Sequence, residues 1–272
     1  MRSRTEMPRR SFIINGVAAA SLLSSEILGK EIMTNTVPGR DIQVDAKPEP
    51  ITFNTSRTAV IVVDMQNDFG SRGGMFDRAG IDISGIQKAV LPTARVIAAA
   101  RRLGIPIVYL KMGYQADLSD LGTPDSVNRV RHMRLGVGSP VKAPDGRDSR
   151  ILIRDTWNTD IVTELKPEPK DTVIYKTRFS GFYNTDLDAI LRKGGIRHLL
   201  FTGCTTSICV DSTVRDAMFR DYLPILLSDC MSEPIGEGFE RTNHAASLLS
   251  AEVLLGWVSD SGSLALSIGN AK

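Results

Sequence analysis

The stretch TAVIVVD, residues Thr58–Asp64, decides the fold class of this protein. It is a continuous run of apolar, mostly β-branched residues, which is typical of a strand buried on both faces. Similar runs follow downstream, and segments with the apolar spacing of helices separate them. The further predicted strands are residues 105–111, 171–176, 198–203 and 223–230, and the predicted helices are residues 86–104, 185–195, 207–222 and 238–255.

This alternation of strands and helices predicts an α/β protein with a parallel sheet. Right-handed βαβ crossovers place helices on both faces of such a sheet. Folds of this kind hold their chemistry at the carboxyl ends of the strands. A polar stretch over about residues 114–155, rich in Gly, Pro, Asp and Arg, interrupts the alternation. We interpret it as a functional insertion rather than a linker.

Composition narrows the classes of function. The chain has 272 residues, of which 42% are hydrophobic and 24% charged, and this suits one large domain or at most two. A formal net charge of +2 gives no broad basic surface, so nucleic acid is not an expected partner. Three cysteines without a CxxC pair do not indicate a disulfide framework. No apolar run approaches the ~20 residues that span a bilayer, so no membrane association is expected of the mature protein.

The first 46 residues differ from the rest of the chain. MPRRSFIINGVAAASLLSS, residues 7–25, joins a positive segment with Arg9 and Arg10 to a short apolar stretch. This resembles a twin-arginine export signal, with VDA at residues 44–46 as a cleavage site. We therefore predict an export leader over residues 1–46, a folded domain over residues 47–272 and a periplasmic location. A frayed amphipathic N-terminus on a cytoplasmic protein is the alternative.

Three polar side chains lie at the carboxyl ends of predicted strands. Asp64 closes the first strand, Lys176 closes the strand 171–176, and Cys209 follows the strand 198–203 in the first turn of the next helix. Because these ends share one edge of a parallel sheet, we expect an aspartate, a lysine and a cysteine to meet there. Taken singly, each has a structural alternative: a capping aspartate, a solvated lysine or a packed cysteine.

The chemistry of these three residues is that of a nucleophile with a base. A helix N-terminus and a nearby ammonium both favour the thiolate of Cys209. Most cysteine hydrolases use a histidine base, but no histidine is expected at this edge. Asp64 is the better proton acceptor, and Lys176 would hold the carboxylate and the sulfur in register. The three histidines are His132 in the insertion, His198 at the start of a strand and His244 in the last predicted helix.

Three motifs together resemble those of the isochorismatase-like cysteine hydrolases, over about residues 50–262. They are AVIVVDMQNDF (59–69), IYKTRFSGFYNTDLDAIL (174–191) and TGCTTSICVDSTVRDAMFRDY (202–222). The resemblance implies a Rossmann-like three-layer αβα fold with a six-stranded, mainly parallel sheet. It implies a catalytic triad of Asp64, Lys176 and Cys209. It also implies a cis peptide between Cys204 and Thr205, so that the backbone N–H groups of Thr205 and Cys209 form an oxyanion hole, with Cys204 itself as scaffolding.

Within that family the chain combines two patterns. PEPITF, RFSGFYNT, GIRHLLFTG and LLGWVSD are similar to ureidoacrylate amidohydrolases, while ADLSDLGTP, RLGVGSP and SRILIRDTWNTDIVTEL look like biuret hydrolases. The resemblance implies a cysteine amidohydrolase that cleaves a C–N bond of a small ureide or amide through a covalent acyl-enzyme, without a cofactor. A biuret- or triuret-type hydrolase, an exported amidase acting on a larger amide such as an antibiotic, and a non-catalytic binding protein are the alternatives.

The resemblance also bears on metals, substrate contacts and assembly. Nicotinamidases of the same superfamily bind a metal through an aspartate and two histidines, but KMGYQADLSD (111–120) has no histidine, so no metal is expected. Family members usually form dimers or tetramers, which implies a homo-oligomer. Candidate substrate contacts are Asn67, Phe69, Tyr114 and Phe182, and packing is the alternative role for these four residues. Arg131 and Arg134 are candidates for binding a substrate carboxylate, and a solvated surface is the alternative for both.

Overall fold

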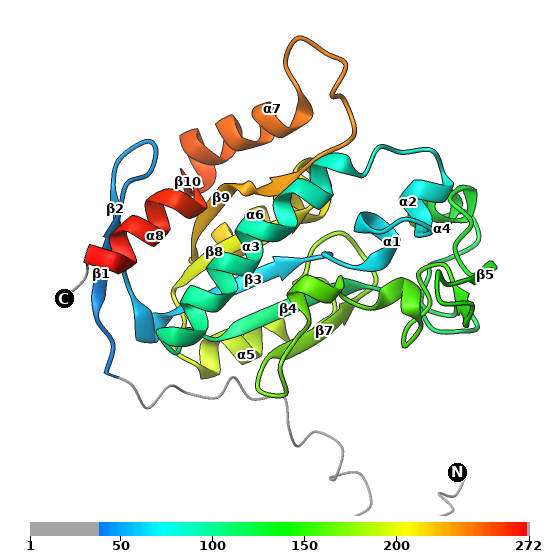
Figure 1. Ribbon diagram of the computed structural model, residues 1–272, viewed down its shortest axis with the longest axis horizontal. Helices are drawn as coiled ribbons and strands as arrows, with labels where there is room; N and C mark the ends of the chain where they lie inside the picture. The colour runs from blue at the N-terminus through cyan, green and yellow to red at the C-terminus, as the bar shows by residue number, and fades with distance from the viewer. Residues whose placement is uncertain (1–37, 271–272) are drawn as a thin grey trace, which may run out of the picture. The chain divides into compact units, whose positions relative to one another are not determined.

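The computed structural model describes residues 38–270, and its centre is a six-stranded sheet (Figure 1). All neighbouring strands run parallel, so the predicted α/β class and the six-stranded sheet are confirmed. In spatial order the strands are β10 (Trp257–Ser259), β9 (Leu223–Ser232), β8 (His198–Cys204), β3 (Thr58–Val63), β4 (Ile107–Met112) and β7 (Thr172–Lys176).

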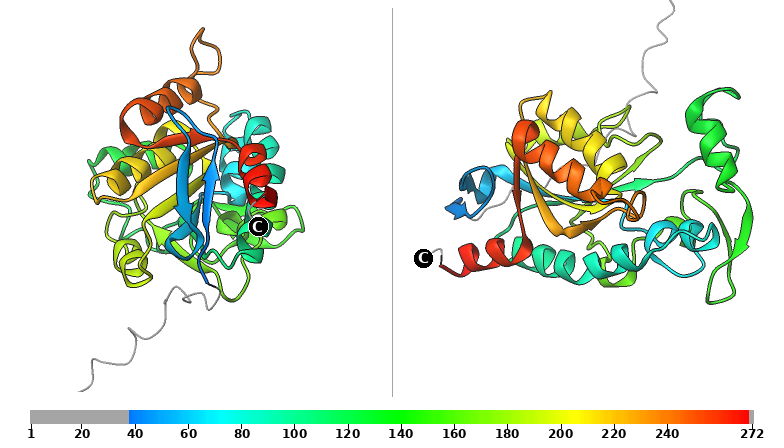
Figure 2. Two further views of the ribbon diagram at one scale, coloured as in Figure 1. Left: turned by 90° about the vertical axis from the view of Figure 1, so that its left-hand side faces the viewer. Right: turned by 90° about the horizontal axis from the view of Figure 1, so that it is seen from above.

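Helices cover both faces of this sheet (Figure 2). One face carries α3 (Ser84–Arg102) and α8 (Ser261–Asn270), and the other carries α5 (Leu187–Lys193), α6 (Asp211–Met218) and α7 (Asn243–Ser250). Strand β3 lies between two hydrophobic cores: Val60 and Val62 pack into the first, and alternate residues such as Ile61 into the second. Burial on both faces explains why β3 reads as a continuous apolar run.

Short elements complete the described chain. The strands β1 (Asp41–Val44) and β2 (Ile51–Asn54) form an antiparallel pair, as do β5 (Pro140–Lys142) and β6 (Asp148–Arg150) in the insertion. The remaining helices are α1 (Asn67–Gly70), α2 (Met75–Arg78), α4 (Val127–Arg134), the 3-10 helices η1 (Thr55–Arg57), η2 (Trp157–Thr159) and η3 (Thr163–Leu165), and the π-helical turns η4 (Thr206–Val210) and η5 (Ala251–Leu255).

The C-terminal third differs from the sequence prediction. The predicted helix 207–222 is the π-helical turn η4 followed by α6, and the predicted helix 238–255 is α7 followed by η5. Beyond it the structure adds β10 and α8. A three-residue strand is too short to give a periodic pattern. The start of β10 depends on a glycine at position 256, because a Cβ at Gly256 would lie 2.3 Å from the carbonyl oxygen of Pro224 on β9.

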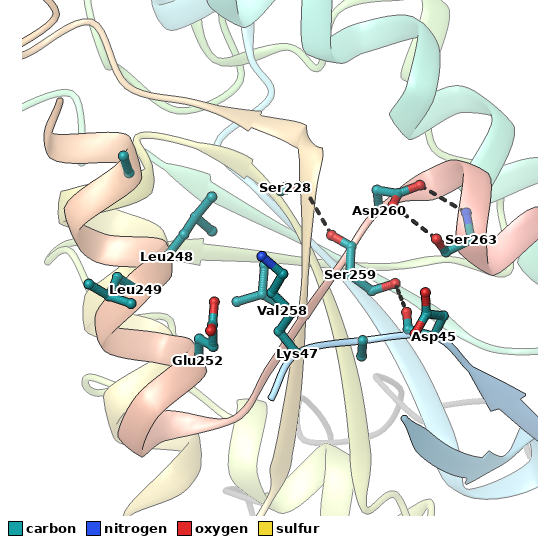
Figure 3. A pocket seen from close by; sticks show the side chains of 12 residues that line it. Asp45, Lys47, Ser228, Leu248, Leu249, Glu252, Val258, Ser259, Asp260 and Ser263 are labelled. Carbon is teal, nitrogen blue, oxygen red and sulfur yellow. Dashed lines mark hydrogen bonds between the residues drawn. The ribbon is translucent and has the colours of Figure 1, made fainter. Parts of the chain in front are cut away.

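The folded body begins before the boundary predicted after residue 46. The side chains of Ile42 and Val44 on β1 are each 1% exposed and belong to the core that α3 covers. The next residues bind β10: Ser259 Oγ donates to the Asp45 carbonyl at 2.6 Å (Figure 3), and the Lys47 N–H donates to the Val258 carbonyl at 2.8 Å. Cleavage after residue 46 would therefore remove a core strand. The twin-arginine motif lies outside the described residues.

A buried carboxylate fastens the insertion to the sheet. Asp68, on α1, accepts hydrogen bonds from the Met75 N–H at 2.9 Å, from the Leu152 N–H at 2.7 Å and from the side-chain amide of Asn158. Burial raises the pKa of Asp68 to about 7, although these three donors favour its charged form. The bonds hold residues of the insertion beside the segment that follows Asp64.

Removal of β1 tests the revised boundary. We expect a chain that begins at Lys47 to have a free energy of unfolding roughly 3–6 kcal/mol below that of a chain that begins at Pro38, because it lacks the buried side chains of Ile42 and Val44. Urea denaturation followed by circular dichroism measures the difference. Equal stability of the two chains would show that β1 contributes nothing to the fold.

The raised pKa of Asp68 predicts a pH-dependent stability. Its pKa is about 7 in the folded chain against 3.8 as the ordinary value, so its protonation stabilises the fold fully below about pH 4. This contribution is lost as the pH rises toward 7, by at most about 1.4 kcal/mol per pH unit. The difference in free energy of unfolding between the wild-type protein and Asp68→Asn, measured by urea denaturation, should therefore become smaller as the pH rises from about 4 to 7. A constant or widening gap would show that Asp68 is ionised throughout.

Candidate active site

Three strand ends converge where the sequence predicted. Asp64 directly follows β3, Lys176 is the last residue of β7, and Cys209 lies in the turn η4 after β8. The Lys176 Nζ lies 2.7 Å from Asp64 Oδ2, and both residues are 0% exposed. Cys209 is buried as well, lines the same cavity as Asp64, and has a pKa that responds to both of these charges. The structure therefore brings the three side chains together in one buried cluster.

Strand order explains this convergence. Strand β3 pairs with β8 on one side and with β4 on the other, and β7 pairs with β4. Met112 of β4 is the register partner of Lys176. The lysine side chain passes Met112 to reach Asp64, with Nζ 3.6 Å from the Met112 sulfur and donating to the Arg178 carbonyl at 3.3 Å. Each of the two charged residues therefore comes from a different strand of one rigid sheet.

The backbone after β8 brings Cys204 and Thr205 close to Asp64. Gly203 has a φ of +118°, and a Cβ there would lie 2.0 Å from the Val63 carbonyl oxygen, so this close approach requires glycine. The peptide between Cys204 and Thr205 is cis, as the resemblance implied. The Cys204 thiol is buried and donates to the Asp64 carbonyl at 3.2 Å, which agrees with a structural role. The oxyanion-hole role of the Thr205 and Cys209 N–H groups stays a prediction.

The electrostatics of the cluster differ from the sequence expectation for Cys209. Burial lowers the pKa of Lys176, but the charges of Asp64 and Cys209 outweigh burial and raise it above its usual range. Burial raises the pKa of Cys209; Lys176 opposes this and Asp64 adds to it. Burial and the Asp64 charge therefore favour the protonated thiol, against the thiolate that Lys176 and the helix N-terminus favour.

Asp64 remains able to accept that proton. Apart from the ion pair with Lys176, neither oxygen of its carboxylate has a hydrogen-bond partner in the described part of the chain. A buried carboxylate oxygen without a donor is a strong acceptor. The arrangement can therefore transfer the Cys209 proton to Asp64 while Lys176 holds the carboxylate in place.

A cavity of about 290 Å³ opens beside the cluster. This volume is at the lower end for ligand sites, so the cavity suits a small molecule. Its wall is predominantly apolar, with a few polar groups. The apolar side chains are Phe69, Met75, Phe76, Ile81, Met112, Leu135, Phe179, Ile208 and Ile235, and the other lining residues are Asp64, Arg131, His132, Cys204, Thr205 and Cys209.

Only one of the four predicted substrate contacts lines this cavity, namely Phe69. The Asn67 amide donates to a backbone carbonyl of η2 at 2.8 Å. Tyr114 is fully buried, and its hydroxyl accepts a hydrogen bond from an amide of α4. Phe182 stacks against another aromatic ring in the core under α5 and α6. Asn67, Tyr114 and Phe182 thus have partners away from the cavity lining, and their role in substrate binding stays a prediction.

Sequence reasoning named Arg131 and Arg134 as candidates, but it missed the helix α4 that carries them and the place of His132 at the cavity. Arg131 and His132 both line the cavity, whereas Arg134 does not. The insertion carried no apolar periodicity that would predict a helix. The start of α4 does carry a capping signal, because the Ser126 side chain accepts a hydrogen bond from the Arg129 N–H at 3.2 Å. That signal could have located the helix, but it could not have shown which of its residues face Cys209.

A second, more open cavity of about 480 Å³ lies between α7, β10 and the segment after β1 (Figure 3). Its polar groups bond to one another: Ser228 Oγ donates to the Ser259 carbonyl at 3.0 Å, and Asp260 accepts from the Ser263 N–H at 2.8 Å. None of the three clustered side chains lines it. We therefore assign the chemistry to the smaller cavity, although the second one is larger.

Two kinds of feature are absent from residues 38–270. No helix there is both long and apolar enough to cross a bilayer. No group of three His, Cys, Asp or Glu side chains in these residues is arranged to hold a metal ion.

Comparison with known proteins places the chain in a family. The isochorismatase domain pattern matches residues 58–263. A ureidoacrylate amidohydrolase, RutB, of Variovorax paradoxus is 42% identical over 214 residues, which cover 79% of this chain and 82% of that protein. A crystal structure of a cysteine hydrolase from Pseudomonas syringae pv. phaseolicola has a TM-score of 0.67 and 28% identity, covering 81% of this chain and 96% of that one.

An N-carbamoylsarcosine amidase from Thermoplasma acidophilum is also similar in structure. It has a TM-score of 0.55 and 28% identity, covering 75% of this chain and 96% of that one. The domain match spans well over half of the chain and includes Asp64, Lys176 and Cys209. The chain belongs to the isochorismatase family.

Proposed function

We propose that this protein is a cysteine amidohydrolase that cleaves a C–N bond of a small ureide or amide. The observation that carries the proposal is the placement of the Cys209 thiol beside a buried Asp64–Lys176 pair at the wall of a small cavity. The names of two similar proteins, a ureidoacrylate amidohydrolase and an N-carbamoylsarcosine amidase, support the reaction class. The reaction requires no cofactor.

The first step forms a covalent acyl-enzyme. The Cys209 sulfur attacks the carbonyl carbon of the substrate while its proton passes to Asp64. The oxyanion accepts hydrogen bonds from the Thr205 and Cys209 N–H groups. The C–N bond then breaks, and Asp64 returns the proton to the departing amine, which leaves a thioester on the sulfur.

The second step restores the thiol. A water molecule gives a proton to Asp64 and attacks the thioester carbon, and the carbamate or acid departs as the sulfur regains a proton from Asp64. Lys176 keeps its charge throughout: it stabilises the Asp64 carboxylate at rest and the sulfur anion when Asp64 is protonated. Its raised pKa fits this role, because the ammonium does not donate its proton at neutral pH.

The substrate that we favour is a ureidoacrylate-like ureide. A biuret- or triuret-type substrate is the alternative, given the motifs of the insertion. An amide of a larger molecule such as an antibiotic is a second alternative, but the cavity of about 290 Å³ would enclose only part of it.

We further propose that the N-terminal segment directs export to the periplasm, with a cytoplasmic location as the alternative. The Arg9–Arg10 pair before an apolar stretch supports this proposal. Since β1 begins at Asp41, a cleavage site compatible with the fold lies before that residue rather than after Ala46. A fusion to a reporter that is active only after export tests the signal, with Arg9→Lys/Arg10→Lys as the control.

We also propose a homo-oligomer. The exposed apolar side chains of α7 and η5 support it, because three of them lie close together in sequence, up to the first residue of the LLGWVSD segment. They are Leu249, Val253 and Leu254, of which the last is 78% exposed. Light scattering of the wild-type protein and of Val253→Glu/Leu254→Glu would test the assembly.

Replacement of the nucleophile should abolish turnover. We expect Cys209→Ala and Cys209→Ser to release ammonia from ureidoacrylate at least about 10³-fold more slowly than the wild-type protein. Cys230→Ala is the matched control, since Cys230 is also buried but does not line the cavity. Thermal melting confirms that each variant is folded. Turnover retained by either Cys209 variant would remove the proposed mechanism.

Breaking the buried ion pair should destabilise the protein. Lys176→Met leaves the Asp64 charge buried without a partner, so we expect the free energy of unfolding to fall by about 3–5 kcal/mol. The double variant Asp64→Asn/Lys176→Met should recover part of this loss, because no charge remains buried, yet it should stay inactive. Urea denaturation measures both variants. A double variant less stable than Lys176→Met would contradict the pairing.

A further inference from the structure

Helix α4 places two neighbouring polar side chains at the wall of the active-site cavity, and the mechanism above uses neither. Arg131 is exposed at the cavity, while His132 is 7% exposed. The helix belongs to the insertion and not to the sheet that carries Asp64 and Cys209. Its residues can therefore differ in chemistry without altering the reaction centre.

The hydrogen bond of His132 determines its tautomer. Its Nδ1 lies 2.7 Å from the carbonyl oxygen of Asn128, which can only accept, so Nδ1 carries the hydrogen. Burial lowers the pKa of His132; the bond to Asn128 and the charge of Asp64 oppose this, while Lys176 and Arg178 add to it. The ring is neutral at neutral pH. Its Nε2 is then an acceptor, and it has no hydrogen-bond partner among the described residues.

Two aromatic rings hold this acceptor in place. The Tyr114 ring meets the His132 ring edge-on at a centroid distance of 5.5 Å, and the Phe179 ring lies 6.0 Å away at an interplanar angle of 33°. With Nδ1 also fixed, the imidazole cannot turn without losing these contacts. The imidazole is therefore held in one orientation in the cavity wall.

Arg131 decides the net charge of the cavity wall. Within the described residues it forms no ion pair, and the only carboxylate of the wall, Asp64, is already paired with Lys176. Since His132 is neutral, the Arg131 guanidinium is the one uncompensated charge of the lining. A cation beside apolar side chains attracts an anion more strongly than a fully hydrated cation does.

We propose that α4 selects the substrate: Arg131 binds a carboxylate of the substrate, and His132 Nε2 accepts a hydrogen bond from one of its N–H groups. This proposal rests on the proposed function and deepens it. The cavity is small enough for one molecule to reach both Cys209 and Arg131. The substrate class is then a carbamoyl compound with a carboxylate, and a neutral ureide such as biuret is discriminated against.

The discrimination has a physical basis in both residues. A substrate without a carboxylate leaves the guanidinium unpaired beside an apolar wall. A substrate without the N–H leaves a buried acceptor unsatisfied, and sites built to hydrogen-bond a substrate strongly reject analogues that lack the donor. Arg131 and His132 thus discriminate between ureides by their charge and hydrogen-bonding groups, while the residues at the sheet edge carry out the reaction.

The first experiment compares two probes that differ only in charge, N-carbamoyl-β-alanine and its neutral carboxamide. We expect the wild-type protein to prefer the carboxylate, and Arg131→Met to reduce the ratio of the two kcat/KM values at least tenfold, mainly through KM. Arg134→Met is the matched control, since Arg134 lies on the same helix but does not line the cavity, and it should keep the wild-type ratio. An unchanged ratio in Arg131→Met would overturn the role of Arg131.

The second experiment separates the two nitrogens of His132. Gln can place an acceptor near the position of Nε2, whereas Asn can keep only the donor to the Asn128 carbonyl. We expect His132→Gln to retain most of kcat/KM for the carboxylate probe and His132→Asn to lose at least tenfold. Equal losses in the two variants would show that His132 only supports packing, and would overturn its proposed role.

Binding without turnover distinguishes this proposal from the proposed function. Calorimetry with the Cys209→Ala variant measures affinity for the same two probes, whether or not the wild-type protein hydrolyses them. Tighter binding of the carboxylate, lost on adding Arg131→Met, supports selection by α4 even if no ammonia is released. Equal binding of the two probes, or binding of neither, overturns it.

Discussion

The ion pair between Asp64 and Lys176 is the interaction on which the rest of the site depends. Both side chains are fully buried, and moving each charge out of water costs several kcal/mol, so neither is tolerated in the core without the other. Their contact at 2.7 Å requires β3, β4 and β7 to stand side by side in one register. The sheet topology thus creates the site, and the ion pair in turn constrains the topology.

The same pair explains how the nucleophile behaves. A lone ammonium would favour a thiolate, but burial and the Asp64 charge both raise the pKa of Cys209 and favour the thiol. The base is then part of the same cluster as the nucleophile, and the proton moves only a short distance. Because the charges of Asp64 and Lys176 compensate each other, the pair can lie beside a predominantly apolar wall.

Reaction and selection are divided between two parts of the chain. The sheet edge supplies Asp64, Thr205 and Cys209, whose positions follow from strand order. The insertion supplies Arg131 and His132, and hydrogen bonds to a buried carboxylate on α1 hold this insertion against the sheet. Such a division allows one reaction centre to serve different ureides, because the wall can change while the strand ends do not.

Local sequence determined five of the six strands of the sheet and the α/β class. It also predicted the meeting of Asp64, Lys176 and Cys209, because carboxyl ends of parallel strands share an edge. It could not show that β1 belongs to the body, that η4 is π-helical, or that His132 lies at the cavity while Asn67, Tyr114 and Phe182 do not. Those facts depend on contacts between residues far apart in the chain. Periodicity reports which face of an element is buried, and only tertiary packing decides what that face touches.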